Sequence, residues 1–362
     1  WNWNAGDTDS KTYAVTVVSD SGNKYRFDGF GTSAVTLDLA EGGTYIFDQS
    51  DSSNAGHPLR FSTTANGTHG GGSEYTTGVT TAGTPGSSGA YTQIVVAASA
   101  PTLYYYCSVH SGMGGQANTN STLGSSNFDG TIQSVVKTSP TAGFSIVSYE
   151  GNNVQGATVG HGLGVAPSVV IVKNRESSYN WAIWHQSLTS AAYVVHLNLT
   201  NAQGSVPGIF NSTLPTSTVF SLGGGSQGDR FLSNEPNKDF IAYIFSEVAG
   251  YSKFGSYKGN GNSDGTFVFT DFRPSWILVK RSSGTENWAL WDNKRDGGNN
   301  VNGYLLRPDS NTNEGGNVSG HQIDILSNGF KFRNSDSKSN NSGSTYIYFA
   351  FAESPFKNAR AR

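Results

Sequence analysis

Pro167-Ser-Val-Val-Ile-Val-Lys173 returns 107 residues later as Pro274-Ser-Trp-Ile-Leu-Val-Lys280, and Asn180-Trp-Ala-Ile-Trp184 returns at the same spacing as Asn287-Trp-Ala-Leu-Trp291. These runs are rich in β-branched and aromatic residues, and Gly, Asn and Ser are frequent around them, which is typical of β-strands and turns. Two copies are too few for a solenoid. The repeat therefore predicts two similar β-sandwich modules of the jelly-roll kind.

Strand patterns also fill the N-terminal part. Ala34–Leu39 alternates apolar and polar residues, as a half-buried strand does. Short strands separated by turns are typical of a sandwich or barrel, and we expect no helix longer than two turns. The small, polar run 116–127 predicts a linker or long loop. We therefore predict an all-β chain with a sandwich over 1–117, a linker over 118–143, and repeated β-modules over 144–255 and 256–362.

Composition excludes several classes of protein. Only 14% of the 362 residues are charged, and the net charge is −3. With no basic stripe in the sequence, we expect no nucleic-acid partner, and with no long apolar run we expect no membrane span. The 12% of aromatic residues exclude general disorder. The sequence begins at Trp1 rather than Met, so we expect a processed chain or part of a longer product.

One heptapeptide contains the only Cys and the only Met: Cys107-Ser-Val-His110-Ser-Gly-Met113. His57 lies 50 residues before the Cys. Thiolate, two imidazoles and thioether are the ligand set of a mononuclear blue-copper site. We therefore predict that His57, Cys107, His110 and Met113 bind copper. Two alternatives stay open: Cys107 and Met113 are ordinary core side chains, or copper or zinc is bound only to stiffen a loop.

Gly56-His57, followed by a strand and the Cys-x-x-His-x-x-Met loop, resembles the cupredoxins. This resemblance implies a Greek-key sandwich in which His57, Cys107 and His110 are equatorial ligands and Met113 is the weak axial ligand. The chain departs from the family in two places. Pro58 stands where many cupredoxins have an Asn that steadies the ligand loop, and a Gly/Thr-rich insertion over 64–84 contains His69.

The repeated Trp pairs are candidates for ligand binding. Trp181 and Trp184 are an odd number of residues apart, so in a strand they point to opposite faces. One ring of each pair is expected in the core, and the other is available to stack on a sugar. We name Trp184 and Trp291 as possible ligand-binding residues. The alternative is that both rings of each pair belong to the core.

Further runs cover most of the chain. The repeat region contains His161-Gly-Leu-Gly-Val-Ala-Pro-Ser-Val-Val-Ile-Val-Lys-Asn-Arg175, Ala249-Gly-Tyr-Ser-Lys-Phe-Gly-Ser-Tyr257 and Phe351-Ala-Glu-Ser-Pro-Phe-Lys357. These runs resemble structural proteins of marine tailed phages, particularly those of cyanobacteria, and Gly56-His-Pro-Leu-Arg-Phe-Ser-Thr63 resembles domains of such virion proteins. The resemblance implies a tail fibre or other virion appendage.

That role sets the expected partners and location. We expect an extracellular virion protein that contacts other virion proteins and a host receptor or glycan, and that forms a closed homo-oligomer, most simply a trimer. We expect no enzyme activity. A bound metal would then act as a folding staple. Two other functions stay open: a secreted or periplasmic blue-copper electron carrier, and a cell-surface adhesin or filament subunit.

Overall fold

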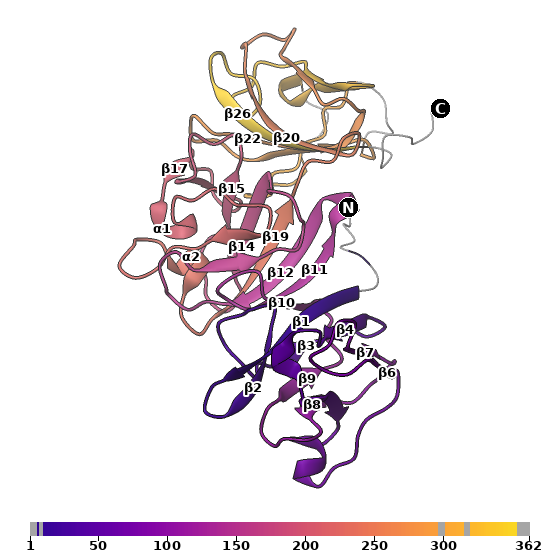
Figure 1. Ribbon diagram of the computed structural model, residues 1–362. Coiled ribbons are helices and arrows are strands. Elements are labelled where there is room, and N and C mark those ends of the chain that lie inside the picture. The colour runs from indigo at the N-terminus through magenta and orange to yellow at the C-terminus, as the bar shows by residue number, and fades with distance from the viewer. Residues whose placement is uncertain (1–5, 7–9, 296–300, 315–318, 353–362) are drawn as a thin grey trace. The chain divides into compact units, whose positions relative to one another are not determined.

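The computed structural model describes residue 6 and residues 10–295, 301–314 and 319–352 (Figure 1). The end of the run predicted through Lys357 therefore lies outside the described residues. The all-β prediction is confirmed, because the helices in the described part are single turns. They are α1 (Pro207–Phe210), α2 (Phe231–Asn234), and the 3₁₀ turns η1 (Ser52–Asn54), η2 (Gly67–Gly70), η3 (Pro140–Ala142) and η4 (Ser319–His321).

The chain divides into two compact units. Unit 1 comprises 1–139, 145–149 and 158–162, and unit 2 comprises 140–144, 150–157 and 163–362. The boundary expected at 117 lies inside unit 1.

Unit 1 contains two β-sheets. One has the strand order β2-β1-β4-β7-β6 and the other β3-β9-β8-β5. β1 is parallel to β4 and β3 is parallel to β9, whereas the other neighbours are antiparallel. The strands are β1 (Ser10–Ser19), β2 (Asn23–Phe27), β3 (Leu37–Asp38), β4 (Thr44–Asp48), β5 (Leu59–Ser62), β6 (Val79–Ala82), β7 (Tyr91–Val95), β8 (Leu103–Cys107) and β9 (Gly115–Asn118).

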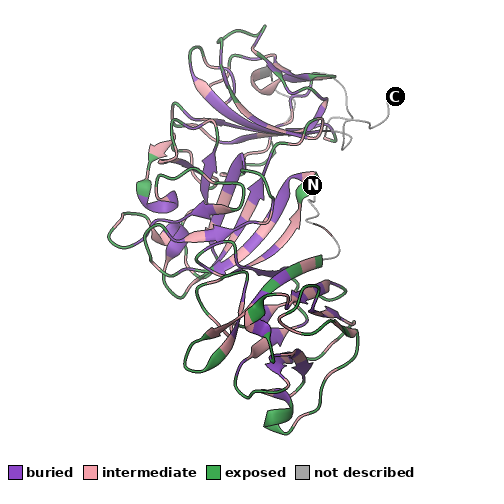
Figure 2. Cartoon of the chain, in the orientation of Figure 1, coloured by how far each residue is buried: buried purple, intermediate pink, exposed green. Residues whose placement is uncertain are grey.

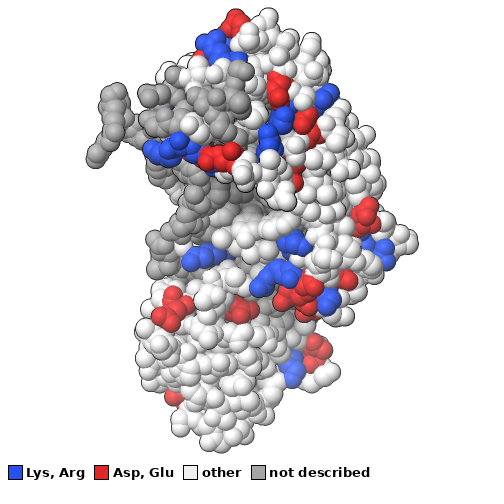
Figure 3. All heavy atoms as spheres, turned by 180° about the vertical axis from the view of Figure 1, so that it is seen from behind, with Lys and Arg blue, Asp and Glu red and all other residues white. Residues whose placement is uncertain are grey.

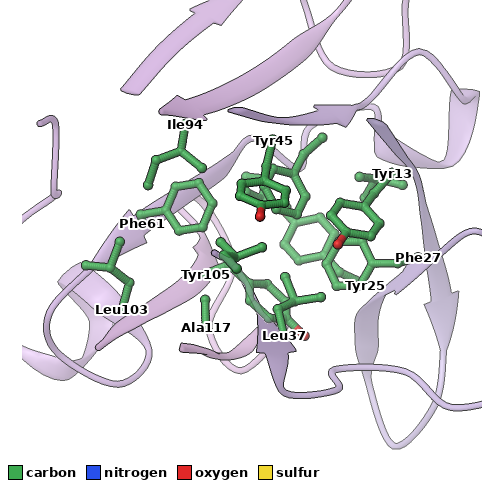
Figure 4. Close-up of a cluster of buried hydrophobic side chains, with 14 of the residues drawn as sticks. Tyr13, Tyr25, Phe27, Leu37, Tyr45, Phe61, Ile94, Leu103, Tyr105 and Ala117 are labelled. Carbon is green, nitrogen blue, oxygen red and sulfur yellow. The ribbon is translucent and has the colours of Figure 1, made fainter. Parts of the chain in front are cut away.

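Side chains from both sheets form one aromatic core (Figure 4). Tyr45 and Phe47 on β4 are fully buried, and the residues between and beside them are not, as period-two burial requires. The rings of Tyr13 and Phe47 stack with their centroids 5.4 Å apart. Cys107 and Met113 belong to this cluster of buried side chains. Two of the predicted metal ligands are therefore built into the core.

The predicted linker over 118–143 is not a structureless connection. It contains β10 (Ser125–Asn127) and β11 (Ser134–Ser139), which pair antiparallel. The Ser126 carbonyl accepts a hydrogen bond from the Tyr13 hydroxyl at 2.9 Å, and the Ser126 hydroxyl accepts one from the Asp38 N–H at 2.8 Å. Small polar residues thus form a buried strand here because their polar groups find partners. β12 (Phe144–Glu150) and β13 (Thr158–Gly160) follow.

Unit 2 contains the second repeat copy and most of the first, whose residues 145–149 and 158–162 belong to unit 1. In the first copy the strand order is β19-β14-β15-β16-β17, and buried and partly buried residues alternate along β14 and β19 (Figure 2). Its strands are β14 (Val169–Asn174), β15 (Ala182–His185), β16 (Tyr193–His196), β17 (Gly204–Ser205), β18 (Val219–Ser221) and β19 (Asp239–Phe245).

The second copy has two sheets around one core, with orders β20-β26-β22-β23 and β21-β25-β24. Its strands are β20 (Ser252–Lys258), β21 (Phe267–Phe269), β22 (Pro274–Arg281), β23 (Ala289–Asp292), β24 (Ile323–Leu326), β25 (Gly329–Phe332) and β26 (Thr345–Ala352). The predicted sandwich character is therefore present.

Strand register confirms the repeat. Ile171 lies opposite Ile183, and Leu278 lies opposite Leu290, at the 107-residue spacing read from the sequence. A Lys at equivalent positions, partly buried in the first copy and buried in the second, follows the same pattern. The Lys173 ammonium donates to the Tyr179 carbonyl at 2.7 Å, and the Lys280 ammonium donates to the Glu286 carbonyl at 2.6 Å.

A buried Asn side chain makes an equivalent long-range hydrogen bond in each copy. Asn234 Oδ1 accepts from the Asn152 N–H at 2.8 Å, and Asn340 Oδ1 accepts from the Asn260 N–H at 3.0 Å. Both Asn side chains are fully buried. The two copies therefore share an internal polar network as well as a strand order.

Within unit 2 the two copies pack against each other. His185 is fully buried, and its ring lies 5.0 Å from that of Phe349 and 6.5 Å from that of Phe254. The Ser187 N–H donates to His185 Nδ1 at 3.1 Å, so the proton of the neutral ring is on Nε2, which donates to the Tyr348 carbonyl at 3.2 Å. A buried histidine thus links the first copy to the second.

Charged side chains of both signs are scattered over the face drawn in Figure 3. Within the described residues, no helix is long and apolar enough to span a membrane.

Candidate metal centre

Strand pairing brings the predicted ligands together. Cys107 ends β8, and His57 lies two residues before β5 begins at Leu59. The two strands pair antiparallel with Leu59 opposite Cys107, so the loop that contains His57 meets the loop that follows Cys107. His110 lies in this second loop. Because side chains alternate along a strand, Cys107 points into the core of unit 1 and is fully buried.

His57, Cys107 and His110 form a compact group of metal-ligating side chains. Cys107 Sγ is 3.9 Å from His57 Nδ1 and 3.8 Å from His110 Nδ1. The ligand atoms of the three residues all lie within 4.8 Å of one another, and in the described part of the chain this is the one such group of His, Cys, Asp or Glu. The His110 N–H donates to the Cys107 sulfur at 3.4 Å, which holds the loop against the thiol.

Burial favours the metal-binding form of His57. Its side chain is 9% exposed, and its pKa is lowered by burial and, to a smaller extent, by His110. A lower pKa keeps the imidazole neutral, which metal binding requires. The Tyr25 hydroxyl and the Gln49 amide both donate to the His57 carbonyl at 2.8 Å and fix the backbone that carries the ring. Burial, and then the nearby Cys107, raises the pKa of Tyr25, so its hydroxyl stays protonated.

Met113, the fourth predicted ligand, lies in the hydrophobic core of unit 1. It is buried in the same cluster as Cys107, and its carbonyl accepts from the Tyr25 N–H at 3.0 Å. His110, in contrast, is exposed. The thiol and the thioether are therefore shielded from water, whereas one imidazole reaches the surface.

The Gly/Thr-rich segment 64–84 contacts the loop that follows Cys107. Asn66 Nδ2 donates to the Ser111 hydroxyl at 2.8 Å, and Asn66 Oδ1 accepts from the Gly112 N–H at 2.8 Å. His69 Nε2 lies 3.1 Å from the Cys107 carbonyl oxygen. Asn66 was not singled out in the sequence, because nothing in its spacing relates it to a loop 45 residues away. These contacts hold the loop that follows Cys107.

The donor set of this group fits copper. Thiolate favours Cu(I) and imidazole also accepts Cu(II), so the combination suits a metal that is stable in both states. Zinc is also bound by Cys and His, so the three residues alone fit either metal. Met113 would favour copper, because thioether is a soft ligand.

The Trp prediction was wrong for the residues that were named. Trp184 and Trp291 are buried, and Trp291 Nε1 donates to the His321 carbonyl at 2.9 Å inside the second copy. Neither ring is available to stack on a sugar. The ring that stays half-buried is that of Trp181, which stacks on Tyr243. Alternation along the strand separates the two faces correctly, but it does not say which face is covered.

The family described as a domain of unknown function, DUF7483, matches residues 117–355. The match contains both repeat copies and begins after the His57, Cys107 and His110 group. No curated protein and no solved structure matches the chain. Because the match covers about two thirds of the 362 residues, the chain belongs to the DUF7483 family.

Proposed function

We propose that unit 1 binds one copper ion through His57, Cys107 and His110, with Met113 as the fourth ligand. The observation that carries the proposal is the convergence of one thiol and two imidazole nitrogens within 4.8 Å. Bound copper would supply one-electron redox chemistry. The chain's own residues would bury the thiol, keep the His57 ring neutral and hold the ligand loop through Asn66.

We further propose that the copper stabilises a structural protein of a virion appendage, in line with the phage resemblance. The chain has a single Cys and so forms no internal disulfide. A metal that binds only the native state stabilises the fold by about 4 kcal/mol when its concentration is about 1,000 times its Kd. It would tie β5 to the loop after β8, which are far apart in the sequence.

An electron carrier is the second candidate, and one observation favours it. His110 is exposed while Cys107 is buried behind it. This arrangement gives a buried metal a ligand at the surface, which electron exchange with a partner requires.

The experiment is copper binding to the purified full chain, followed by native mass spectrometry and visible absorption. We expect one copper per chain and an intense thiolate-to-copper charge-transfer band. Cys107→Ser should lose the band, and His57→Ala should weaken binding. The control His321→Gln, whose histidine lies in unit 2, should bind as the unmodified chain does. Equal copper retention by Cys107→Ser and the unmodified chain would refute the site.

Thermal unfolding with copper and with zinc separates the two roles. A metal that only stabilises the fold needs ligation and no redox chemistry, so either ion that binds should raise the unfolding temperature of unit 1. An electron carrier should in addition give a reversible voltammetric wave with copper. Copper binding without any rise in the unfolding temperature would contradict the proposed stabilising role of the metal.

A further inference from the structure

The second repeat copy has an outer sheet face that is buried and contacts the first copy through Trp288, Lys280 and Phe349. Five side chains form this face, and all are buried: Leu278, Lys280, Trp288, Ile347 and Phe349. Trp288 Nε1 donates to the His196 carbonyl at 2.9 Å. Lys280 Nζ donates to the Thr200 carbonyl at 2.9 Å. The face therefore binds a specific segment of a sister module through both apolar contact and hydrogen bonds.

The same face of the first copy is open. Its equivalent residues are only partly buried, and we call them the open face: Ile171, Lys173, Trp181, Ile241 and Tyr243. The Trp181 and Tyr243 rings stack with centroids 6.4 Å apart. In the described part of the chain the Trp181 indole N–H has no hydrogen-bond partner, whereas the equivalent N–H of Trp288 has one. The open face is thus equivalent to the covered face of the second repeat copy, but no described segment of the chain is docked on it.

The segment that occupies the covered face also has a counterpart. In the first copy Asn198 Oδ1 accepts from the Trp181 N–H at 3.0 Å, and in the second copy Asp309 Oδ1 accepts from the Trp288 N–H at 3.2 Å. The Leu199 N–H bonds the His196 carbonyl, as the Ser310 N–H bonds the Arg307 carbonyl. Segment 306–311 therefore repeats segment 195–200, 111 residues later.

Segment 306–311 lies at the surface. Pro308 and Asn311 are exposed, and Arg307, Asp309 and Ser310 are partly exposed. We call it the edge segment.

We infer that two copies of this chain associate head to tail, with the edge segment of one docked on the open face of the other. The Trp181 indole N–H of one chain then donates to the Arg307 carbonyl of the neighbouring chain. This bond repeats the one that Trp288 makes to the His196 carbonyl within a single chain. The open face also continues into Ile183 and His185, on the same side of the sheet, which are already buried. Docking therefore extends an existing interface.

The occupant is a copy of the chain rather than a glycan for a specific reason. The five equivalent positions of the second copy are covered by protein, and the covering segment has a free counterpart in the same chain. Because the open face and the edge segment are different surfaces, the contact is heterologous, and repetition yields a ring or an open filament. This inference is independent of copper binding.

The test is sedimentation velocity of the full chain over a concentration series. We expect self-association by about 100 µM, where an interface with a Kd of about 10 µM is largely occupied. Trp181→Glu or Tyr243→Glu on the open face, and Asn311→Arg on the edge segment, should each weaken association at least tenfold, because such changes remove or oppose central contacts. The control is Leu214→Glu, at a position that is 62% exposed and outside both surfaces.

Mixing identifies the geometry. Trp181→Glu retains a working edge segment, and Asn311→Arg retains a working open face. Mixed in equal amounts, the two variants should form dimers and nothing larger. An unmodified chain that stays monomeric at about 100 µM overturns the inference, as does association unchanged by Trp181→Glu. A monomer that binds glycans through Trp181 also overturns it, in favour of a sugar platform.

Discussion

Acid should destabilise unit 2 through His185, and the effect can be calculated. Burial lowers the pKa of His185 to about 4, despite the hydrogen bond to the Tyr348 carbonyl. The unfolded chain has a His pKa of about 6.5, so it binds the proton more tightly than the folded chain does. Stability from this group is therefore complete above about pH 6.5 and falls as the pH drops toward about 4. The loss is about 2 kcal/mol at pH 5 and about 3 kcal/mol in full.

The assay is denaturant unfolding followed by tryptophan fluorescence at pH 7 and pH 5. All tryptophans among the described residues lie in unit 2, at 181, 184, 276, 288 and 291. His185→Gln retains a donor and an acceptor but does not titrate in this range. Subtracting the pH dependence of this variant removes the contributions of other groups. If the unmodified chain and His185→Gln lose equal stability between the two pH values, the reasoning about a buried neutral imidazole is wrong.

Two further predictions concern buried and loop-fixing asparagines. Asn340→Ala should lower the unfolding free energy by about 3 kcal/mol, because it leaves several buried backbone groups without partners, and Asn234→Ala in the first copy should lower it by a similar amount. Denaturant unfolding measures both losses. A loss below about 1 kcal/mol in each variant would contradict the shared network. Asn66→Ala should speed amide exchange of Gly112 in the metal-free chain roughly tenfold, measured by NMR, and an unchanged rate would show that the loop is held by other contacts.

The candidate site was largely predictable because most of it is local in the sequence. Cys107, His110 and Met113 share one heptapeptide, and their residue types alone define a soft ligand set. His57 was named because a second imidazole completes the ligand set, but its approach to Cys107 depends on the pairing of β5 with β8, which no periodicity reveals. Asn66 was missed because a hydrogen bond between two loops leaves no sequence pattern.

The repeat was predictable for a different reason. Two similar sequences place apolar residues at the same spacing and therefore form the same strands, so Ile171 and Leu278 occupy equivalent positions in their sheets. What the repeat could not predict is where the copies differ. Trp181 and Trp288 are equivalent in sequence, but one is half-buried and the other is covered by the sister copy. Burial here depends on the contact between copies, which is not encoded in either copy alone.

This difference between equivalent residues separates the two proposals physically. The proposed copper site depends on contacts inside unit 1, where Cys107 is buried and the loop after it is held by residues of the same chain. Self-association depends on surfaces inside unit 2, where the open face repeats a covered one. Substitutions at Trp181 should therefore leave copper binding intact, and removal of copper should leave the open face intact. A chain built in this way would combine a locally stabilised metal module with a repeat that propagates the assembly.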